Sequence, residues 1–154
     1  MADRKQLAAT AQLAGVAKLM MHTVRLQAAI EARAVARREL AELFAAIIES
    51  KDYLGLPYID ADGSQRHVAD FDEYCMVFYG QSGWLARELI ANFDMLGADL
   101  YEAAERIGLC RDDYDDLRAL PADALAVVKA ALAEGQDPFE VLHQLEEARS
   151  SNPN

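Results

Sequence analysis

The sequence predicts an all-α fold: a long N-terminal helical arm followed by a bundle of short helices, with one small β-hairpin near residues 58–68. Three observations indicate this. Residues 3–50 contain one glycine and no proline, which favours uninterrupted helix. The next segment has the composition of a tight turn between short extended runs. From residue 70 onward, capping residues and glycines punctuate the chain. We therefore expect an arm at residues 1–50 and a helical domain at residues 51–154, enough chain to bury a core.

The arm carries a continuous heptad pattern. As one helix it would extend about 70 Å, longer than a compact domain of this size. Residues at alternating three- and four-residue spacing form a seam: Val16, Leu19, Thr23, Leu26, Ile30, Arg33, Arg37, Leu40, Phe44 and Ile47. A second apolar stripe lies beside it: Leu13, Ala17, Met20, Val24 and Ala28. The wide apolar surface predicts packing on more than one neighbour. We expect a homodimer through this arm, although a core helix of an intrachain bundle would show a similar pattern.

The segment after the arm has the chemistry of a hairpin. Asp60-Ala-Asp-Gly-Ser separates two short runs, and Gly63 suits a turn position with positive φ. Asp60, Asp62 and Ser64 are spaced like the start of a calcium loop. The twelfth position is Phe71, however, where such a loop needs a bidentate glutamate. We predict a hairpin here and no metal site.

The remaining helices are delimited by capping residues and glycines. The expected starts are marked by Asp70, Ser82, Asp99, Asp112, Pro121 and Asp137, and the expected ends by Gly80, Gly97, Gly108 and Gly135. Asp70 with Glu73, and Asp99 with Glu102, have the capping-box spacing. These boundaries predict two helix-turn-helix units, at residues 70–94 and 99–120.

The first unit contains the motif "FDEYC" followed by "YGQSGWLARELI". These residues, with the preceding "LFAAIIESKDYL", resemble the helix-turn-helix of phage, plasmid and mobile-element DNA-binding proteins, some of them related to partition proteins. The resemblance covers about residues 43–93. It implies that the second helix enters the major groove, with Gln81, Ser82, Trp84 and Arg87 facing DNA. By helical position, Gly83, Glu88 and Asn92 are also expected to be exposed, and Asn92 is a further candidate for contact with DNA.

The second unit has an acidic face. Its second helix carries Asp112, Asp113, Asp115 and Asp116. Carboxylates oppose binding to phosphate, because DNA affinity depends on Lys and Arg displacing counterions. A solvated surface, a protein-binding surface and a DNA-mimicking surface all fit this pattern.

Basic and acidic residues are unevenly distributed along the chain. The net charge is −11, yet residues 1–38 carry +5 and the other 116 residues carry −16. This polarity indicates an arm that meets an acidic surface of the chain itself, of a partner, or of nucleic acid. Arm residues available for phosphate contacts are Arg25, Arg33, Arg37 and Arg38.

No pattern indicates catalysis, a cofactor or a metal. Nucleotide-binding loops, catalytic triads and zinc-protease motifs are absent from the sequence, and the three histidines lack ligand spacing. Cys75 and Cys110 form no C-x-x-C pair and predict two buried, reduced thiols in a cytoplasmic protein. No window is apolar and long enough for a membrane span.

Two functions remain. The one that the sequence favours is a sequence-specific DNA-binding transcriptional regulator of helix-turn-helix type, dimeric and from a mobile element, with duplex DNA as its partner. The other is an acidic protein-interaction module, an adaptor, anti-repressor or inhibitor, which binds a basic protein through the aspartates of residues 99–123. Exposed Trp84 and Leu85 suit a protein contact better than a phosphate contact.

Overall fold

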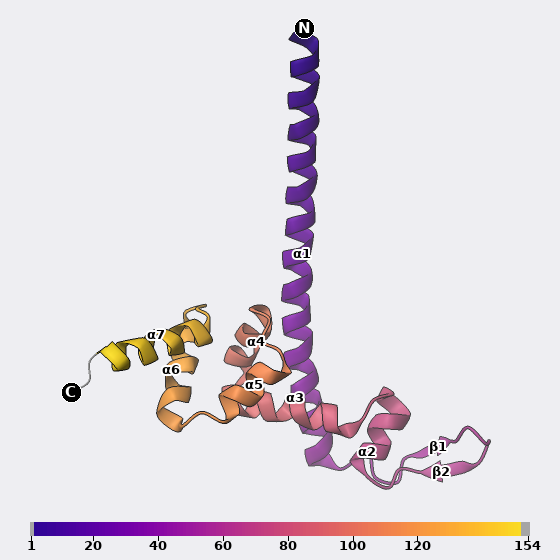
Figure 1. The fold of residues 1–154 in the computed structure, drawn as a ribbon. Coiled ribbons are helices and arrows are strands. Elements are labelled where there is room, and N and C mark those ends of the chain that lie inside the picture. The colour runs from indigo at the N-terminus through magenta and orange to yellow at the C-terminus, as the bar shows by residue number, and fades with distance from the viewer. Residues whose placement is uncertain (1, 152–154) are drawn as a thin grey trace. The chain divides into compact units, whose positions relative to one another are not determined.

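A computed structural model of the 154-residue chain describes residues 2–151 (Figure 1). The all-α prediction and the small hairpin are confirmed. The elements are α1 (Ala2–Ser50), β1 (Pro57–Ile59), β2 (Gln65–His67), α2 (Phe71–Tyr74), a π-helical segment η1 (Cys75–Tyr79), α3 (Gly83–Leu96), α4 (Ala98–Arg106), α5 (Arg111–Arg118), α6 (Ala122–Ala133) and α7 (Pro138–Ser151).

The chain forms two units, which divide at Arg33, inside α1, rather than at residue 50. In the first unit, residues 3–33 are helical and exposed. In the second unit, Ala34 and Ala41 are completely buried, and Phe44 is nearly so. The predicted heptad seam is therefore used in two ways. Its C-terminal positions belong to the core of the second unit, whereas its N-terminal positions are exposed.

The core of the second unit joins the end of α1 to the short helices. Leu40 and Ile47 of α1 pack against this core, alongside Phe44. Its buried members are Ala41, Phe44, Phe71, Cys75, Ala86, Leu89, Leu96, Tyr101, Ala104, Leu109, Tyr114, Leu117, Val128 and Leu132. Because these residues come from α1 through α6, the last part of α1 is a structural element of the domain.

The hairpin is held to the start of α2. β1 and β2 pair antiparallel with Tyr58 opposite Arg66, and Gly63 has φ +80°. The Tyr58 hydroxyl donates to the Glu73 carboxylate, which also accepts from the Ala69 backbone N–H at 2.7 Å. These two bonds hold the pKa of Glu73 below its usual value, the tyrosine bond having the larger effect.

Most predicted helix boundaries are confirmed. Asp70 caps α2 by accepting from the Glu73 N–H at 2.8 Å, and Ser82 caps α3. The capping role expected for Asp99 is wrong: Gly97 is the N-cap of α4, and Asp99 lies in its first turn. Gly97 has φ +81° and ψ 165°, so it can end α3 and begin α4 without a longer connection.

Candidate functional site

The turn between η1 and α3, within the first predicted helix-turn-helix unit, is built from two glycines. The π-helical segment ends at Gly80, whose φ of +74° is in the left-handed region that favours glycine. Ser82 then accepts from the Trp84 N–H at 3.2 Å and starts α3. Gly83 is buried, because α3 approaches α2 so closely that a Cβ here would lie 2.1 Å from Asp72 Oδ1. The expectation that Gly83 is exposed is therefore wrong.

Arg87 is held by the helix that precedes its own. Its Nη1 lies 2.7 Å from Asp72 Oδ1, and its guanidinium carbon lies 5.3 Å from the centre of the Phe71 ring. Phe71 is buried, whereas about half of the Arg87 side chain is exposed. Arg87 thus has a salt bridge and a cation–π contact within its own domain.

Trp84 is exposed, as expected, and is covered on one side by α5. The guanidinium carbon of Arg111 lies 4.4 Å from the Trp84 ring centre, while Arg111 Nε lies 3.1 Å from Glu88 Oε1. The acidic helix α5 therefore contacts the helix that the sequence predicts to face DNA. Glu88 is only partly exposed because it takes part in this contact.

Asn92 is not available for binding. It is 3% exposed, and its side-chain oxygen accepts a hydrogen bond from Arg118 Nη2. Arg118 also bonds to Asp115 Oδ1 at 2.8 Å. The expectation of an exposed Asn92 is wrong because the end of α3 faces α5 and the core at this position. An interhelical pair between Asn92 and Arg118 could not be derived from local periodicity.

A group of apolar side chains is exposed around the same turn. We call it the turn patch; it consists of Met76, Val77, Phe78, Tyr79, Trp84 and Leu85, each 39–58% exposed. Two members are fixed by ring contacts, since Phe78 stacks on Tyr74 at 5.4 Å and Tyr79 meets Phe44 edge-on at 5.0 Å. Large apolar residues exposed on both sides of one turn make this part of the surface a candidate for binding. Gln81 and Ser82 are exposed between its two halves.

The predicted arm arginines fall into two groups. Arg25 and Arg33 are exposed in the first unit. In the second unit, Arg37 Nε lies 2.9 Å from Glu105 Oε2, and Arg38 Nε lies 2.7 Å from Glu102 Oε2. The structure therefore separates these four residues by role: two lie on the exposed arm, and two join α1 to α4.

A buried polar cluster surrounds Glu105, which sequence patterns did not single out. Glu105 is 3% exposed and accepts a bond from the Tyr114 hydroxyl at 2.9 Å, in addition to its ion pair with Arg37. Burial, with Glu105 nearby, raises the pKa of Tyr101 to about 12 and raises that of Tyr114 as well. The cluster links α1, α4 and α5. Its internal pairing and burial indicate a structural role.

The acidic face of α5 is only partly free. Asp112, Asp115 and Asp116 are exposed, whereas Asp113 is partly buried and accepts from the Cys110 backbone N–H at 2.7 Å. Asp113 is therefore the N3 member of the capping box of its own helix, whose N-cap is Cys110. Asp115 bonds to Arg118, so Asp112 and Asp116 are the aspartates best placed for an outside partner.

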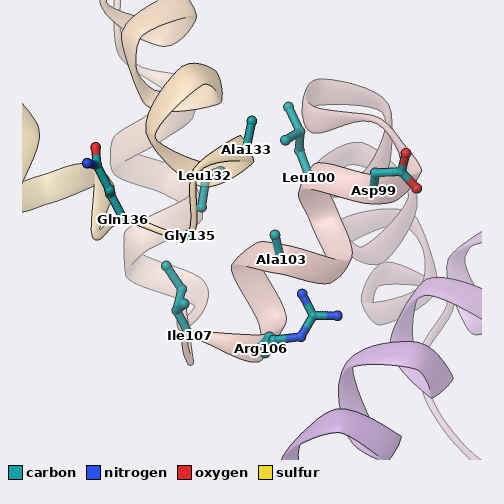
Figure 2. Close-up of a pocket in the computed structure, with 9 residues that line it drawn as sticks. All are labelled: Asp99, Leu100, Ala103, Arg106, Ile107, Leu132, Ala133, Gly135 and Gln136. Carbon is teal, nitrogen blue, oxygen red and sulfur yellow. The ribbon is translucent and has the colours of Figure 1, made fainter.

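A groove of about 640 Å³ lies between α4 and α6 (Figure 2). Figure 2 shows Leu100 and Ala103 on the α4 side and Leu132 and Ala133 on the α6 side. Its other lining residues are Asp99, Arg106, Ile107, Gly135 and Gln136. Within residues 2–151, no group of three or more His, Cys, Asp or Glu side chains could hold a metal ion.

Neither cysteine has a disulfide partner. Cys75 is buried in the core of the second unit, and burial raises the pKa of its thiol, which disfavours the reactive thiolate. The expectation that both cysteines are buried is wrong for Cys110, which is exposed because it is the N-cap residue of α5, outside the core. Among the helices of residues 2–151, none has an apolar stretch long enough to span a bilayer.

Comparison with known proteins gives no relative: no family model, no curated protein and no solved structure matches this chain.

Proposed function

We propose that this chain is an acidic protein-interaction module built on a helix-turn-helix scaffold, which binds a partner protein through the turn patch. The observation that carries the proposal is the patch itself. Six large apolar side chains are exposed on the two segments that flank the turn, and two of them, Trp84 and Leu85, lie in the first turn of the helix that a DNA-reading unit would place in the major groove. Aromatic residues such as Trp84, Phe78 and Tyr79 are enriched at protein interfaces, where they supply much of the binding energy.

Electrostatics support the same proposal. Residues 34–154 contain 10 basic and 24 acidic residues, a net charge of −14. The basic residues on α3 and α5 already have carboxylate partners: Arg87 pairs with Asp72, Arg111 with Glu88 and Arg118 with Asp115. DNA affinity arises largely from counterions released when Lys and Arg neutralise phosphates. If these arginines turned toward DNA, their salt bridges would break. The carboxylates that they now neutralise would then face the phosphates and repel them.

The charge near the patch indicates the partner's chemistry. α5 borders the patch, because Arg111 lies over Trp84, and α5 carries exposed Asp112 and Asp116. We therefore propose a partner surface with an apolar centre and neighbouring Lys or Arg side chains. Charge complementarity of this kind speeds association and selects the partner, while the apolar centre provides affinity.

A DNA-binding transcriptional regulator is the second candidate, and one observation favours it. The N-terminus of α3 is exposed at Gln81 and Ser82, and a helix N-terminus attracts anions such as phosphate. In that function Gln81, Ser82, Trp84 and Arg87 would contact DNA, and Arg25 and Arg33 would add phosphate contacts from the arm. Duplex binding would then weaken steeply as salt is raised.

Affinity capture from the native cell, with nuclease treatment, tests the first proposal. The bait variants are Phe78→Ser, inside the turn patch, and Ile59→Ser, on an exposed hairpin position outside it. We expect a protein retained after nuclease treatment by the original chain and by Ile59→Ser, and lost with Phe78→Ser. Equal retention by both variants would exclude the turn patch as the binding surface. Loss of all captured material on nuclease treatment would favour the regulator.

A further inference from the structure

The exposed part of the heptad seam lies on the first unit and takes no part in the turn patch. Val16, Leu19, Leu26 and Ile30 are 39–66% exposed in the single chain. They lie on one side of an uninterrupted helix, at alternating spacings of three and four residues. A helical face of this kind is stable in water only when another surface covers it.

From this face we infer that residues 13–33 of α1 pair with the same residues of a second copy of this chain, as a parallel two-stranded coiled coil. The residue types along the seam indicate that a second copy of the same helix covers it. With Val16 at heptad position a, the a positions are Val16, Thr23 and Ile30, and the d positions are Leu19 and Leu26. β-Branched side chains at a, with leucine at d, favour two parallel strands over trimers and tetramers.

Thr23 fits this seam despite its hydroxyl group. Its Oγ1 donates to the Leu19 carbonyl of the same helix at 2.9 Å. The hydroxyl therefore needs no partner across the seam, and Thr23 can contribute its methyl group to the packing.

The positions flanking the seam do not oppose parallel pairing. Positions e hold Leu13, Met20 and Gln27, and positions g hold Gly15, His22 and Ala29. Leu13 and Met20 belong to the second apolar stripe, whose other members lie at positions b and f, outside a two-stranded seam. The pair therefore covers less apolar surface than the packing on more than one neighbour that the width of the arm predicts. No e or g position in this region holds a Lys, Arg, Asp or Glu, so the g position of one copy meets the e position of the other without like-charge repulsion. Lys18 and Arg25 fall at position c, outside the seam, where they remain in solvent.

The seam also has a defined end. Arg33 follows at position d, and two copies of a charged side chain would face each other there. Beyond it, Arg37 pairs with Glu105, while Leu40, Phe44 and Ile47 pack within the second unit. The paired region therefore stops near Arg33, which leaves each domain its own core. The inference is independent of what the turn patch binds.

Sedimentation velocity of the full chain tests the stoichiometry. We expect twice the chain mass of 17.0 kDa at micromolar concentration. Leu26→Asp should weaken self-association at least about a hundredfold, because it places two carboxylates in the seam. Met21→Asp is the matched control, since Met21 is 60% exposed at position f, opposite the seam, and it should leave the dimer intact.

A cysteine at the seam tests the orientation. In a Cys110→Ser background, Leu19→Cys should form an interchain disulfide on mild oxidation, because a parallel pair places the two residues together. A monomer, a trimer or a tetramer would overturn the inference, and so would an intact dimer of Leu26→Asp or dissociation of Met21→Asp. A dimer in which Leu19→Cys does not crosslink would overturn the parallel arrangement.

Discussion

Arg37 Nε lies 2.9 Å from the carboxylate of Glu105, and this ion pair fastens the last part of α1 to α4 inside the second unit. The Glu105 side chain is 2% exposed, while that of Arg37 retains some contact with solvent. The Tyr114 hydroxyl bonds to the other carboxylate oxygen, so three helices meet at one buried charge.

Glu105→Ala should therefore lower the free energy of unfolding by about 3 kcal/mol, since it removes one member of a buried pair and leaves the partner groups unmatched. Urea denaturation measures this. Glu102→Ala is the control on the same helix: Glu102 also pairs with arginines but is more exposed, so its loss should cost about 1 kcal/mol or less. Equal losses in the two variants would contradict the special role of Glu105.

The two buried tyrosines predict loss of stability at alkaline pH. Burial, followed by the nearby Glu105 charge, raises the pKa of Tyr101 to about 12 and raises the pKa of Tyr114 above its ordinary value. Stability from these groups is complete below about pH 10, where unfolded tyrosine begins to ionise, and is lost as pH rises through the folded-state values.

The check is the urea midpoint between pH 8 and pH 11.5. The slope of stability against pH should be shallower in Tyr114→Phe than in the original chain. Tyr79→Phe, at a partly exposed position, is the control and should keep the original slope. An unchanged slope in Tyr114→Phe would count against the tyrosine contribution.

Gly83→Ala should destabilise the second unit by about 1–3 kcal/mol, because the new Cβ would meet Asp72, 2.1 Å from its Oδ1 and 3.1 Å from its Cα. Displacing Asp72 would also disturb its pair with Arg87. Gly15→Ala on α1 is the contrasting variant: nothing lies within 4 Å of its Cβ, and alanine favours helix by about 1 kcal/mol. Thermal unfolding followed by circular dichroism should show a lower unfolding temperature for Gly83→Ala and a higher one for Gly15→Ala.

Arg87→Ala should cost less than about 1 kcal/mol in stability, because both Arg87 and Asp72 are half exposed and water screens their attraction. Urea denaturation measures this too. If the loss of stability is this small, Arg87→Ala keeps its fold, and a change in its binding can be assigned to the lost side chain. A loss of several kcal/mol would mean that Arg87 is mainly structural.

Local signals predicted the fold well, and long-range contacts limited what could be said of the site. The capping residue Ser82 and the positive-φ glycines Gly63 and Gly80 act within a few residues, so their roles could be read directly. The burial of Asn92 depends on Arg118, 26 positions later, and the close approach of Gly83 depends on Asp72 in another helix. Neither is encoded in a local period.

The arm illustrates the same limit. Its heptad pattern runs without a break from Val16 to Ile47, and nothing in it marks where intrachain packing begins. That boundary is set by buried partners such as Glu105 on α4 and Phe71 on α2, which are distant in sequence. The predicted arm therefore ended at residue 50, whereas the two units divide at Arg33.

Binding of labelled duplex DNA at low salt is the most direct test of the central claim, which is that the helix-turn-helix scaffold serves a protein contact. Fluorescence anisotropy should be recorded at about 50 mM salt with a mixed-sequence duplex and with promoter DNA from the protein's own operon, up to about 100 μM chain, where non-specific DNA binders associate. We expect no binding to either duplex. Binding that falls steeply with salt and is lost in Arg87→Ala would contradict the claim and establish the DNA-binding regulator instead.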